Sequence, residues 1–309
     1  MIVVSFHGIL GLFISTNMRI VSVRHVPEHC QACPRAIQRC DPIILPEHLL
    51  QYLHVNFCQL LKISHVLDHS PRELSNGQKQ RTALALALVA DPDILLLDDP
   101  LRNVDAKLRY EMRLELPALL KRAGSTVLYV TQDFKEAMAL GDRIAVLLDG
   151  EIAQCDTPAR IYAEPASVGV ARLFGDPTLN LIEVEPRLID GAPEILVGGA
   201  AIRLPASYAA AADRTYLLGL RPESLRLVDA AAPGAIAVDV VAVTPLNEKS
   251  VLLLTMEGGR EVLASEAGDR DEPRRTGPAH IGFDMESVLL FDRASGRRFI
   301  PADDGGGAA

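Results

Sequence analysis

Two adjacent carboxylates, Asp98 and Asp99, follow a continuous apolar run at Ile94–Leu97. Such a run is typical of a strand buried in a parallel sheet, and open α/β sheets bind their ligands beyond the carboxyl ends of those strands. A carboxylate at this edge is an oxygen ligand that suits Mg²⁺, usually through water. A second carboxylate can position or deprotonate an attacking water. We therefore take Asp98 as a candidate metal ligand and Asp99 as a candidate catalytic group.

A helix start at Ser75, Asn76, Gly77 and Gln78 is the second place where the sequence offers a ligand site. Ser75 can act as the N-cap and Gln78 as its partner in a capping box, and Asn76 and Gly77 tolerate a left-handed backbone. The first turn of such a helix offers unpaired N–H groups and the positive end of the helix dipole, which favour phosphate oxygens. An ordinary capped helix is the alternative interpretation of these residues.

The hydrophobic pattern predicts the elements that hold these residues. Residues 57 to about 180 alternate helical patterns with short apolar strands, which predicts an α/β domain. A second buried strand is expected at Thr126–Val130, just before Gln132, and a turn at Asn103–Asp105 leads into a polar helix over residues 106–120. Both candidate sites thus lie in the α/β region.

Residues 181 to 301 have a different pattern, in which short alternating strands such as Ala235–Val243 and Ser250–Thr255 are separated by turn signals. The turn signals include Asp190–Gly191, Gly198–Gly199 and Gly258–Gly259. This pattern predicts a small antiparallel β-barrel or sandwich. Residues 302–309 are expected to form a flexible tail. Residues 1 to 56 are irregular and have no apolar periodicity that matches a partner face, so we expect them to pack weakly.

Several motifs, taken in order, resemble those of the ABC ATPases. The stretches LSNGQ (74–78), ILLLDDP (94–100), RNVDAKLR (102–109) and LYVTQDFKEAM (128–138) are similar to the signature motif, Walker B, D-loop and switch region of that family. The stretch that begins GDRIAVLLDG resembles the carbohydrate-importer branch, of the maltose and glycerol-3-phosphate type. TYLLGLRPESLRL and VLLFDRASGRRF resemble the family's OB-like regulatory barrel, the TOBE domain. The resemblance covers roughly residues 57 to 301.

This resemblance implies a fold and a site. It implies a partial P-loop NTPase (ABC ATPase) domain over residues 57–180 and a TOBE domain over residues 181–301. It also implies ATP and Mg²⁺ as cofactors, with Asp98 facing the metal and Asp99 and Gln132 at catalytic positions. The nucleotide-binding residues that it implies are Ser75, Asn76, Gly77, Gln78 and Asp105.

Three departures from the family pattern concern this chemistry. The phosphate-binding loop G-x-x-x-x-G-K-[ST] occurs nowhere in the sequence, although in the family its backbone N–H groups and its Lys hold the β- and γ-phosphates. Gln132 stands where the family carries His, and an amide can donate to a phosphate oxygen but cannot carry the imidazolium charge. Asp99 stands where the family carries Glu, so its carboxylate is set back by one methylene.

The missing loop directs attention to residues 1 to 56. They are either a divergent replacement for the missing part of the family fold or non-homologous sequence from a frameshift or a mispredicted start, and we favour the second. Cysteines and histidines within residues 25–40 allow a structural zinc site as a minor alternative, although no second half of a zinc finger follows. These residues are His25, His29, Cys30, Cys33 and Cys40.

The composition narrows the possible partners. The chain of 309 residues has a formal net charge of -9, and from residue 181 onward it carries 13 Lys and Arg against 20 Asp and Glu. We therefore expect no nucleic-acid partner. No stretch of the sequence is long and apolar enough to span a bilayer.

Three functions compete at this point. The first is the energy-coupling subunit of a carbohydrate-class ABC importer, cytoplasmic, bound to membrane permease subunits on the inner face of the plasma membrane, and dimeric with an identical or different ATP-binding subunit. The second is a catalytically inactive regulatory or half-site partner of an intact ABC subunit. The third is a gene remnant without a stable fold. The missing loop favours the second and third, and it predicts that the chain alone neither binds nor hydrolyses ATP.

Overall fold

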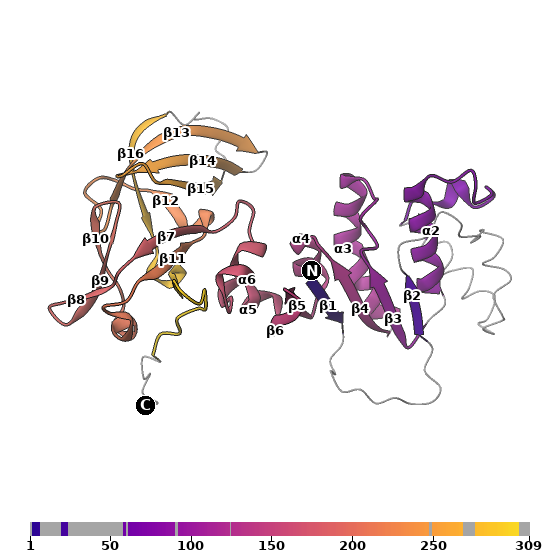
Figure 1. Cartoon of the computed structure of the whole chain (residues 1–309). Coiled ribbons are helices and arrows are strands. Elements are labelled where there is room, and N and C mark those ends of the chain that lie inside the picture. The colour runs from indigo at the N-terminus through magenta and orange to yellow at the C-terminus, as the bar shows by residue number, and fades with distance from the viewer. Residues whose placement is uncertain are drawn as a thin grey trace, which may run out of the picture. The chain divides into compact units, whose positions relative to one another are not determined.

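The computed structural model describes residues 2–6, 20–23, 58–59, 61–89, 92–123, 125–246, 249–267 and 276–302. By its internal contacts the chain divides into two compact units, residues 1–160 and residues 161–309. Figure 1 labels the helices and strands of both units. Within the described ranges, no helix combines the length and the apolar character that a membrane crossing requires.

The first unit is built on a six-stranded sheet with the strand order β2-β3-β4-β1-β5-β6. Its strands are β1 (Ile2–Phe6), β2 (Ile20–Val23), β3 (Ile94–Asp98), β4 (Thr126–Thr131), β5 (Arg143–Leu148) and β6 (Glu151–Asp156). Strand β3 runs parallel to both β2 and β4, which confirms the parallel pair that the two apolar runs predict. The carboxyl ends of β3 and β4 therefore lie at the same edge of the sheet.

Helices of the first unit bury one face of this sheet. They are α2 (Asn76–Val89), α3 (Ala106–Ala123) and α4 (Phe134–Leu140), with a short 3-10 helix at Ser64–Val66. Burial alternates along the strands, since Leu95 and Leu97 of β3 and Val127 and Tyr129 of β4 are buried while their neighbours are more exposed. Helix α3 adds buried residues at a spacing of four. These are Leu108, Met112, Leu116 and Leu120.

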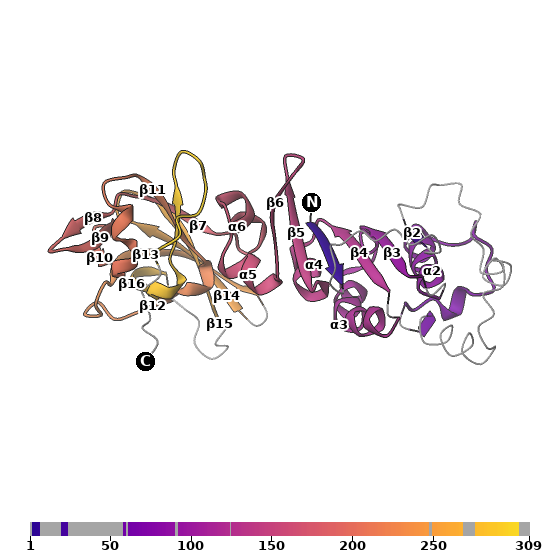
Figure 2. The ribbon, with the colours of Figure 1, turned by 90° about the horizontal axis from the view of Figure 1, so that it is seen from below.

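Strand β1 departs from the expectation for the first part of the chain. It lies between β4 and β5 and is antiparallel to both, as Figure 2 shows. The expectation that residues 1 to 56 pack weakly is therefore wrong for β1 and for β2. Both strands pair their backbones within the sheet, so that their N–H and C=O groups have partners on neighbouring strands. The cysteines and histidines of the zinc alternative lie outside the described residues.

The second unit consists mainly of antiparallel strands in three sheets, with the orders β10-β9-β8, β17-β11-β7 and β12-β16-β13-β14-β15. Its strands are β7 (Asn180–Val184), β8 (Arg187–Ile189), β9 (Ala192–Val197), β10 (Ala200–Arg203), β11 (Tyr216–Leu220), β12 (Leu225–Leu227), β13 (Ile236–Leu246), β14 (Lys249–Met256), β15 (Glu261–Ala267), β16 (Gly277–Phe283) and β17 (Leu289–Asp292). The sheets form a near-closed antiparallel barrel, as the alternating pattern predicts. Helix α5 (Pro158–Ala163) crosses the division at residue 160, and α6 (Val168–Leu173) follows it.

The hairpin turns of the barrel follow the predicted turn signals. Asp190–Gly191 joins β8 to β9, Gly198–Gly199 joins β9 to β10, and Gly258–Gly259 lies between β14 and β15. All six residues have positive φ. A two-residue hairpin loop of the type I′ class needs positive φ at both positions, and Asp and Gly accept this conformation more readily than other residues.

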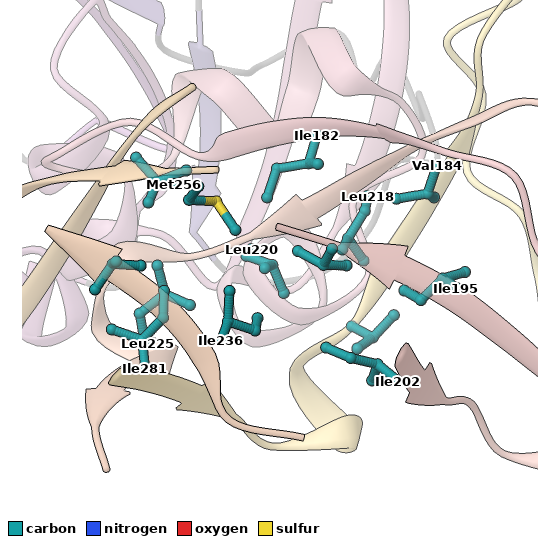
Figure 3. Close-up of a cluster of buried hydrophobic side chains, with 14 of the residues drawn as sticks. Ile182, Val184, Ile195, Ile202, Leu218, Leu220, Leu225, Ile236, Met256 and Ile281 are labelled. Atoms are coloured by element: carbon teal, nitrogen blue, oxygen red, sulfur yellow. The ribbon is translucent and has the colours of Figure 1, made fainter. Parts of the chain in front are cut away.

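Among the described residues, the barrel encloses a large apolar core, and a smaller cluster of Ala171, Leu179, Leu289 and Phe291 lies beside it. Figure 3 shows ten labelled residues from its sheets, with Ile182, Leu218, Leu220 and Ile236 among them. Side chains from all three sheets join this core. The labelled residues are Ile182, Val184, Ile195, Ile202, Leu218, Leu220, Leu225, Ile236, Met256 and Ile281. This burial, rather than any ionisable cluster, is the main source of stability for the second unit.

Candidate functional site

The carboxyl edge of β3 holds the two carboxylates that the sequence singles out. Asp98 is the last residue of β3 and is exposed, whereas Asp99 is half-buried. Asp99 has φ 46°, a left-handed conformation that Asp tolerates better than most residues. Its amide donates to the carbonyl of Val130 at 2.8 Å, and its carbonyl accepts from Nε2 of Gln80 at 3.0 Å. The turn after β3 is thus held by β4 on one side and by α2 on the other.

The electrostatic surroundings of Asp99 favour its neutral form. Partial burial raises the pKa of the Asp99 carboxyl above its ordinary value, and the charge of Asp98 raises it further. Arg102 and Arg109 act in the opposite direction, since a positive charge nearby favours the carboxylate. A carboxyl with a raised pKa is suited to accept or share a proton, which is the role that the sequence assigns to Asp99.

An open hollow of about 650 Å³ lies at this edge of the sheet, and both Asp99 and Gln132 line it. Gln132 follows the end of β4 and is exposed. The other lining residues come from the turn after β3, from α3 and from α4. They are Arg102, Ala106, Arg109, Tyr110, Arg113, Asp133, Phe134, Lys135 and Glu136. The structure thus brings the two predicted catalytic residues to one site.

The helix start at Ser75 has the predicted capping box. The Ser75 amide donates to Oε1 of Gln78 at 2.8 Å, and the Gln78 amide donates to Oγ of Ser75 at 3.3 Å. This reciprocal pair satisfies two donors at the first turn of α2. Ser75 and Asn76 are exposed, and Gln78 is half-buried. Nε2 of Gln78 also lies 3.5 Å from Nε2 of His65.

Gly77 and Asp105 connect this helix start to the turn that precedes α3. A Cβ atom at Gly77 would lie 2.9 Å from the carbonyl oxygen of Asn103, so that only glycine allows the two backbones to approach this closely. Oδ1 of Asp105 accepts from the Leu108 amide at 3.0 Å, and this bond lowers the pKa of the Asp105 carboxyl. Asp105 therefore caps α3 directly beside the start of α2.

The predicted site residues thus lie in two places. The hollow that contains Asp99 and Gln132 is not lined by any of the residues predicted to bind nucleotide. Those residues are Ser75, Asn76, Gly77, Gln78 and Asp105. Asp98, the predicted metal ligand, is exposed beside Asp99. One residue of α2, Gln80, links the two places through its hydrogen bond to the Asp99 carbonyl.

The sequence did not predict a network of hydrogen bonds around a buried carboxylate that follows Gln132 in the chain. Glu136 of α4 is buried, and its Oε2 accepts from the hydroxyls of Tyr129 at 2.8 Å and Thr131 at 3.0 Å. Nε of Arg109 lies 3.8 Å from its Oε1. Burial raises the pKa of the Glu136 carboxyl, and the two hydroxyl donors oppose that rise. The network fixes the first turn of α4, directly after Gln132.

The same turn is held from α3 by an ion pair. Nη2 of Arg113 lies 2.6 Å from Oδ2 of Asp133, and Oδ1 of Asp133 accepts from the Lys135 amide as the N-cap of α4. The sequence signal was the pair Arg109 and Arg113, which are one helical turn apart on α3. Which acidic residues they face depends on how α3 packs against α4, so spacing alone could not identify the partners.

The direction of β1 bears on whether a nucleotide fits this edge. A phosphate-binding loop follows the carboxyl end of a strand and leads into a helix. Ile2, the first residue of β1, pairs with Thr131, while Phe6, its last residue, pairs with Val127. Strand β1 thus ends at the edge opposite Asp98 and Gln132. Among the described residues, a backbone cradle for a triphosphate is not present beside Asp98.

The described residues also offer few ligands for a metal ion beside Asp98. Asp98 is an exposed carboxylate at the right edge of the sheet for Mg²⁺. In the part of the chain that the structure describes, no group of three or more His, Cys, Asp or Glu residues is placed to hold a metal ion. A single protein carboxylate fits a Mg²⁺ ion only where phosphate oxygens and water supply the other ligands.

Comparison with known proteins gives the family. The family model described as ABC transporter matches residues 47–102, and the model described as TOBE domain matches residues 218–291. The diacetylchitobiose uptake system ATP-binding protein MsiK of Streptomyces coelicolor is 35% identical over 257 residues, which cover 78% of this chain and 68% of that protein. The sn-glycerol-3-phosphate import ATP-binding protein UgpC of Chromobacterium violaceum is 38% identical over 242 residues, covering 77% of this chain and 64% of that protein.

The chain therefore belongs to the ATP-binding proteins of ABC transporters, and its second unit carries a TOBE domain. It spans about two thirds of the length of these two relatives. A solved structure, the dimeric structure of the bacterial ABC transporter cassette MJ0796, is 30% identical and covers 40% of this chain and 52% of that chain, with a TM-score of 0.34. The family assignment rests on the sequence relatives.

Proposed function

We propose that this chain is an ATP-binding subunit of an ABC importer for a carbohydrate or a related solute, and that it contributes only half of an ATP site. The solute class is taken from the names of its relatives, which include uptake proteins for diacetylchitobiose and sn-glycerol-3-phosphate. The proposed half is the start of α2, where Ser75, Asn76 and Gly77 face a phosphate bound by another subunit.

The observation that carries this proposal is the separation of the two sets of site residues. The capped start of α2 is preformed, because Ser75 and Gln78 satisfy each other and Gly77 lies against the turn at Asn103. Its exposed first turn offers N–H groups and the positive end of the helix dipole to an outside anion. The edge at Asp98 and Asp99, by contrast, presents carboxylates to a triphosphate without a cradle among the described residues.

The roles of the residues follow from this separation. The start of α2 would bind phosphate oxygens through Ser75, Asn76, Gly77 and Gln78. Asp105 would hold the adjoining turn. When nucleotide and Mg²⁺ are bound between two subunits, they supply the scissile phosphate and its charge neutralisation. Asp98 is the residue of this chain that fits the metal, and Asp99 and Gln132 are the residues that fit an attacking water and a phosphate oxygen.

The proposed partners follow the family. They are membrane permease subunits and a second ATP-binding subunit, identical or different, and the proposed location is the inner face of the plasma membrane. A mixed dimer with an intact subunit would then have at most one working ATP site, and a homodimer would have none. The limits proposed for the ATPase fragment and the barrel are residues 57–180 and 181–301.

The test is to purify the full chain alone and mixed with an intact homologous subunit, and to measure nucleotide binding and phosphate release in each sample. We expect neither from the chain alone and both from the mixture. Ser75→Arg in this chain should abolish the gain in phosphate release, because a long cation would fill the space in front of the helix start. Ser64→Arg, at an exposed serine of the same unit, is the matched control and should leave the gain intact.

Two outcomes would contradict the proposal. Phosphate release by the chain alone that disappears on Asp98→Asn would mean that the chain has a complete site. A mixture no more active than the intact subunit by itself, with the chain folded by circular dichroism, would mean that the start of α2 serves no partner.

A further inference from the structure

Asn76 and Gly77 have a covalent reactivity that the role proposed for this helix start does not use. They are the one pair in the sequence in which glycine directly follows asparagine. The side-chain carbonyl carbon of an asparagine, Cγ, is an electrophile, and the backbone nitrogen of the next residue is the nucleophile that can attack it. Glycine has no Cβ to obstruct that approach. The sequence at this point therefore favours deamidation.

The surroundings of this pair leave both reacting groups available. The Asn76 side chain is exposed. Among the described residues, neither that side chain nor the backbone N–H of Gly77 forms a hydrogen bond, since the first N–H groups of a helix have no intrahelical carbonyl to bond. The capping box engages the amides of Ser75 and Gln78 but not the amide of Gly77 that lies between them. The nucleophile is thus not occupied by another contact.

The charges around Gly77 also favour the reaction. Its backbone nitrogen attacks after it loses its proton, so that negative charge develops at the first turn of α2. The positive end of the helix dipole stabilises that charge. Nε of Arg81 donates to the Gly77 carbonyl at 3.3 Å, which places a guanidinium beside the same residue, and a nearby positive charge favours an anionic group. The local field therefore helps to form the nucleophile.

The other two asparagines that the structure describes lack these conditions. Asn103 is exposed, but the Val104 amide that would attack it donates to the Leu101 carbonyl at 3.1 Å, and valine is branched at Cβ. Asn180 is buried, and its side-chain amide is held by three hydrogen bonds to backbone groups. Both residues are therefore internal controls for the reactivity of Asn76.

The helical backbone sets the rate of the reaction. To close a ring, Asn76 must turn out of its helical conformation, so the reaction proceeds when the first turn of α2 opens. Helix ends fray, but Gly77 lies so close to the turn before α3 that a Cβ there would be 2.9 Å from the Asn103 carbonyl oxygen. Conversion should therefore be slower in the folded chain than in urea, yet proceed without unfolding of the unit.

We propose that Asn76 is a site of spontaneous deamidation, and that its conversion changes the start of α2 from a surface that attracts phosphate into one that repels it. The Gly77 nitrogen forms a bond to Cγ of Asn76, and the side-chain nitrogen leaves as ammonia together with the proton of the Gly77 amide. Water then opens the resulting imide ring at either carbonyl and leaves aspartate or isoaspartate at residue 76. The net reaction consumes one water and releases one ammonia.

Either product places a carboxylate in the first turn of α2. A carboxylate at a helix N-terminus is favourable for the helix itself, so the fold persists, but it repels a phosphate group. Isoaspartate also adds a methylene to the backbone between residues 76 and 77, which displaces Gln78 from its position opposite Ser75. This consequence for binding rests on the proposed function, whereas the deamidation does not.

The experiment keeps the full chain in neutral and in mildly alkaline buffer and follows its peptides by mass spectrometry over time. The peptide that contains residue 76 should gain the mass that accompanies exchange of an amide for an acid, in two chromatographic products. Its rate should rise in proportion to hydroxide concentration, because the deprotonated nitrogen attacks. Peptides that contain Asn103 and Asn180 should not change. Asn76→Gln, whose longer side chain has to close a larger ring, should also stay unchanged.

Two results would overturn the assignment of the modification site. One is a residue 76 that stays intact in the folded chain but converts in urea, because the fold would then protect it. The other is conversion of Asn103 as fast as that of Asn76, because the following glycine and its unbonded amide would then make no difference.

The effect on binding is measured in mixtures with an intact homologous subunit. Phosphate release should fall in step with the converted fraction of this chain, while a mixture with Asn76→Gln should keep its own starting rate over the same time. Fresh Asn76→Asp, checked for folding by circular dichroism, should reproduce the loss. Ser64→Asp adds the same charge at another exposed residue of this unit and should not.

The two parts of the proposal fail separately. Undiminished phosphate release after complete conversion would overturn the effect on binding and leave the modification site in place. A mixture that is inactive from the start would contradict the proposed function, and the mass measurement on the single chain would still decide whether Asn76 deamidates.

Discussion

The two units of this chain differ in how many of their buried polar atoms lack a hydrogen bond and in where those atoms lie. In the barrel unit, Arg221 and Asn180 are buried and bonded to backbone groups on separate segments. In the sheet unit, the buried atoms Oε1 of Gln80, Nε of Arg109 and Nε of Arg113 form no hydrogen bond among the described residues. These three atoms surround the turn and the hollow that contain the candidate catalytic residues. In the barrel unit the same holds for one atom, Oε2 of Glu266, whose Oε1 accepts from the Leu227 amide. Arg221 and Asn180 thus join separate segments of the barrel, whereas most of the unbonded buried atoms lie at one edge of the sheet unit.

This difference indicates where function lies. A buried polar group with all its partners in place mainly specifies a fold, while unpaired capacity concentrated at the carboxyl edge of a parallel sheet is typical of a ligand site. Changes to polar residues should therefore cost the barrel stability without affecting chemistry. In the sheet unit we expect the reverse, namely small changes in stability and large changes in activity.

Arg221 should give the largest effect. Its Nη1 and Nη2 donate to the carbonyls of Phe174 and Tyr162, each at 2.5 Å, and its guanidinium lies 3.6 Å from the centre of the Tyr162 ring. Burial lowers the pKa of Arg221 to about 10, so it remains charged at neutral pH. Arg221→Ala should lower the free energy of unfolding of the barrel unit by about 3 kcal/mol, because two charge-assisted bonds are lost and two carbonyls are left unpaired.

Hydrogen exchange with mass spectrometry can assign this loss to one unit. Peptides from residues 161–302 should exchange faster, and peptides from the sheet unit should not change. Arg226→Ala is the control, since that arginine is exposed and its ion pair with Asp284 spans 3.5 Å, and it should cost less than about 0.5 kcal/mol. Equal acceleration in both units would show that the two are stabilised together, contrary to the comparison.

Asn180 should give the next largest effect. Its Nδ2 donates to the carbonyls of Leu220 at 3.1 Å and Leu263 at 2.8 Å, and its Oδ1 accepts from the Leu263 amide at 2.8 Å. The side chain thereby acts as one rung of a β-ladder between β7 and β15, which belong to different sheets. Asn180→Ala should lower the stability of the barrel by about 2 kcal/mol, because one buried and two partly buried backbone groups lose their partner.

Thermal unfolding followed by circular dichroism would measure this change. The control is Thr178→Ala, because the Thr178 hydroxyl is exposed and has only a long bond of 3.4 Å to the Arg172 carbonyl. Asn180→Asp keeps the acceptor but removes both donors, so it should be at least as destabilising as Asn180→Ala at neutral pH. A stable Asn180→Asp variant would mean that the amide does not bridge the sheets.

Local patterns predicted much of this molecule. The apolar runs before Asp98 and before Gln132 became β3 and β4, because continuous runs of that length suit buried parallel strands. The capping box at Ser75 formed as its spacing requires, and the turn signals of the barrel became hairpins with positive φ. Each of these features is determined within about ten residues of sequence.

Features that depend on distant segments were not predicted. Strand β1 pairs with β4 and β5 across more than a hundred residues, and no local signal gives its direction. The two compact units divide at residue 160, earlier than the change in strand pattern, because Arg221 holds the segment around Tyr162 and Phe174. The network around Glu136 likewise requires α3 and α4 to be placed before its partners can be recognised.

The smallest expected change in stability gives the most direct test of the comparison, because each unit offers the same cap. Oγ of Ser75 accepts from the Gln78 amide at 3.3 Å at the start of α2, and Oγ of Ser167 accepts from the Val170 amide at 3.3 Å at the start of α6. Ser75→Ala and Ser167→Ala should each cost about 1 kcal/mol of stability in their own unit, as expected for the loss of an N-cap. Only Ser75→Ala should lower phosphate release by a mixed dimer with an intact subunit, because only this hydroxyl lies at the helix start that we propose to face a phosphate of another subunit. The measurement pairs unfolding of each variant with phosphate release at saturating ATP.

Equal losses of activity from the two variants would mean that helix capping, and not the position of Ser75, determines activity. The proposed division between a structural barrel and a functional sheet edge would then be wrong.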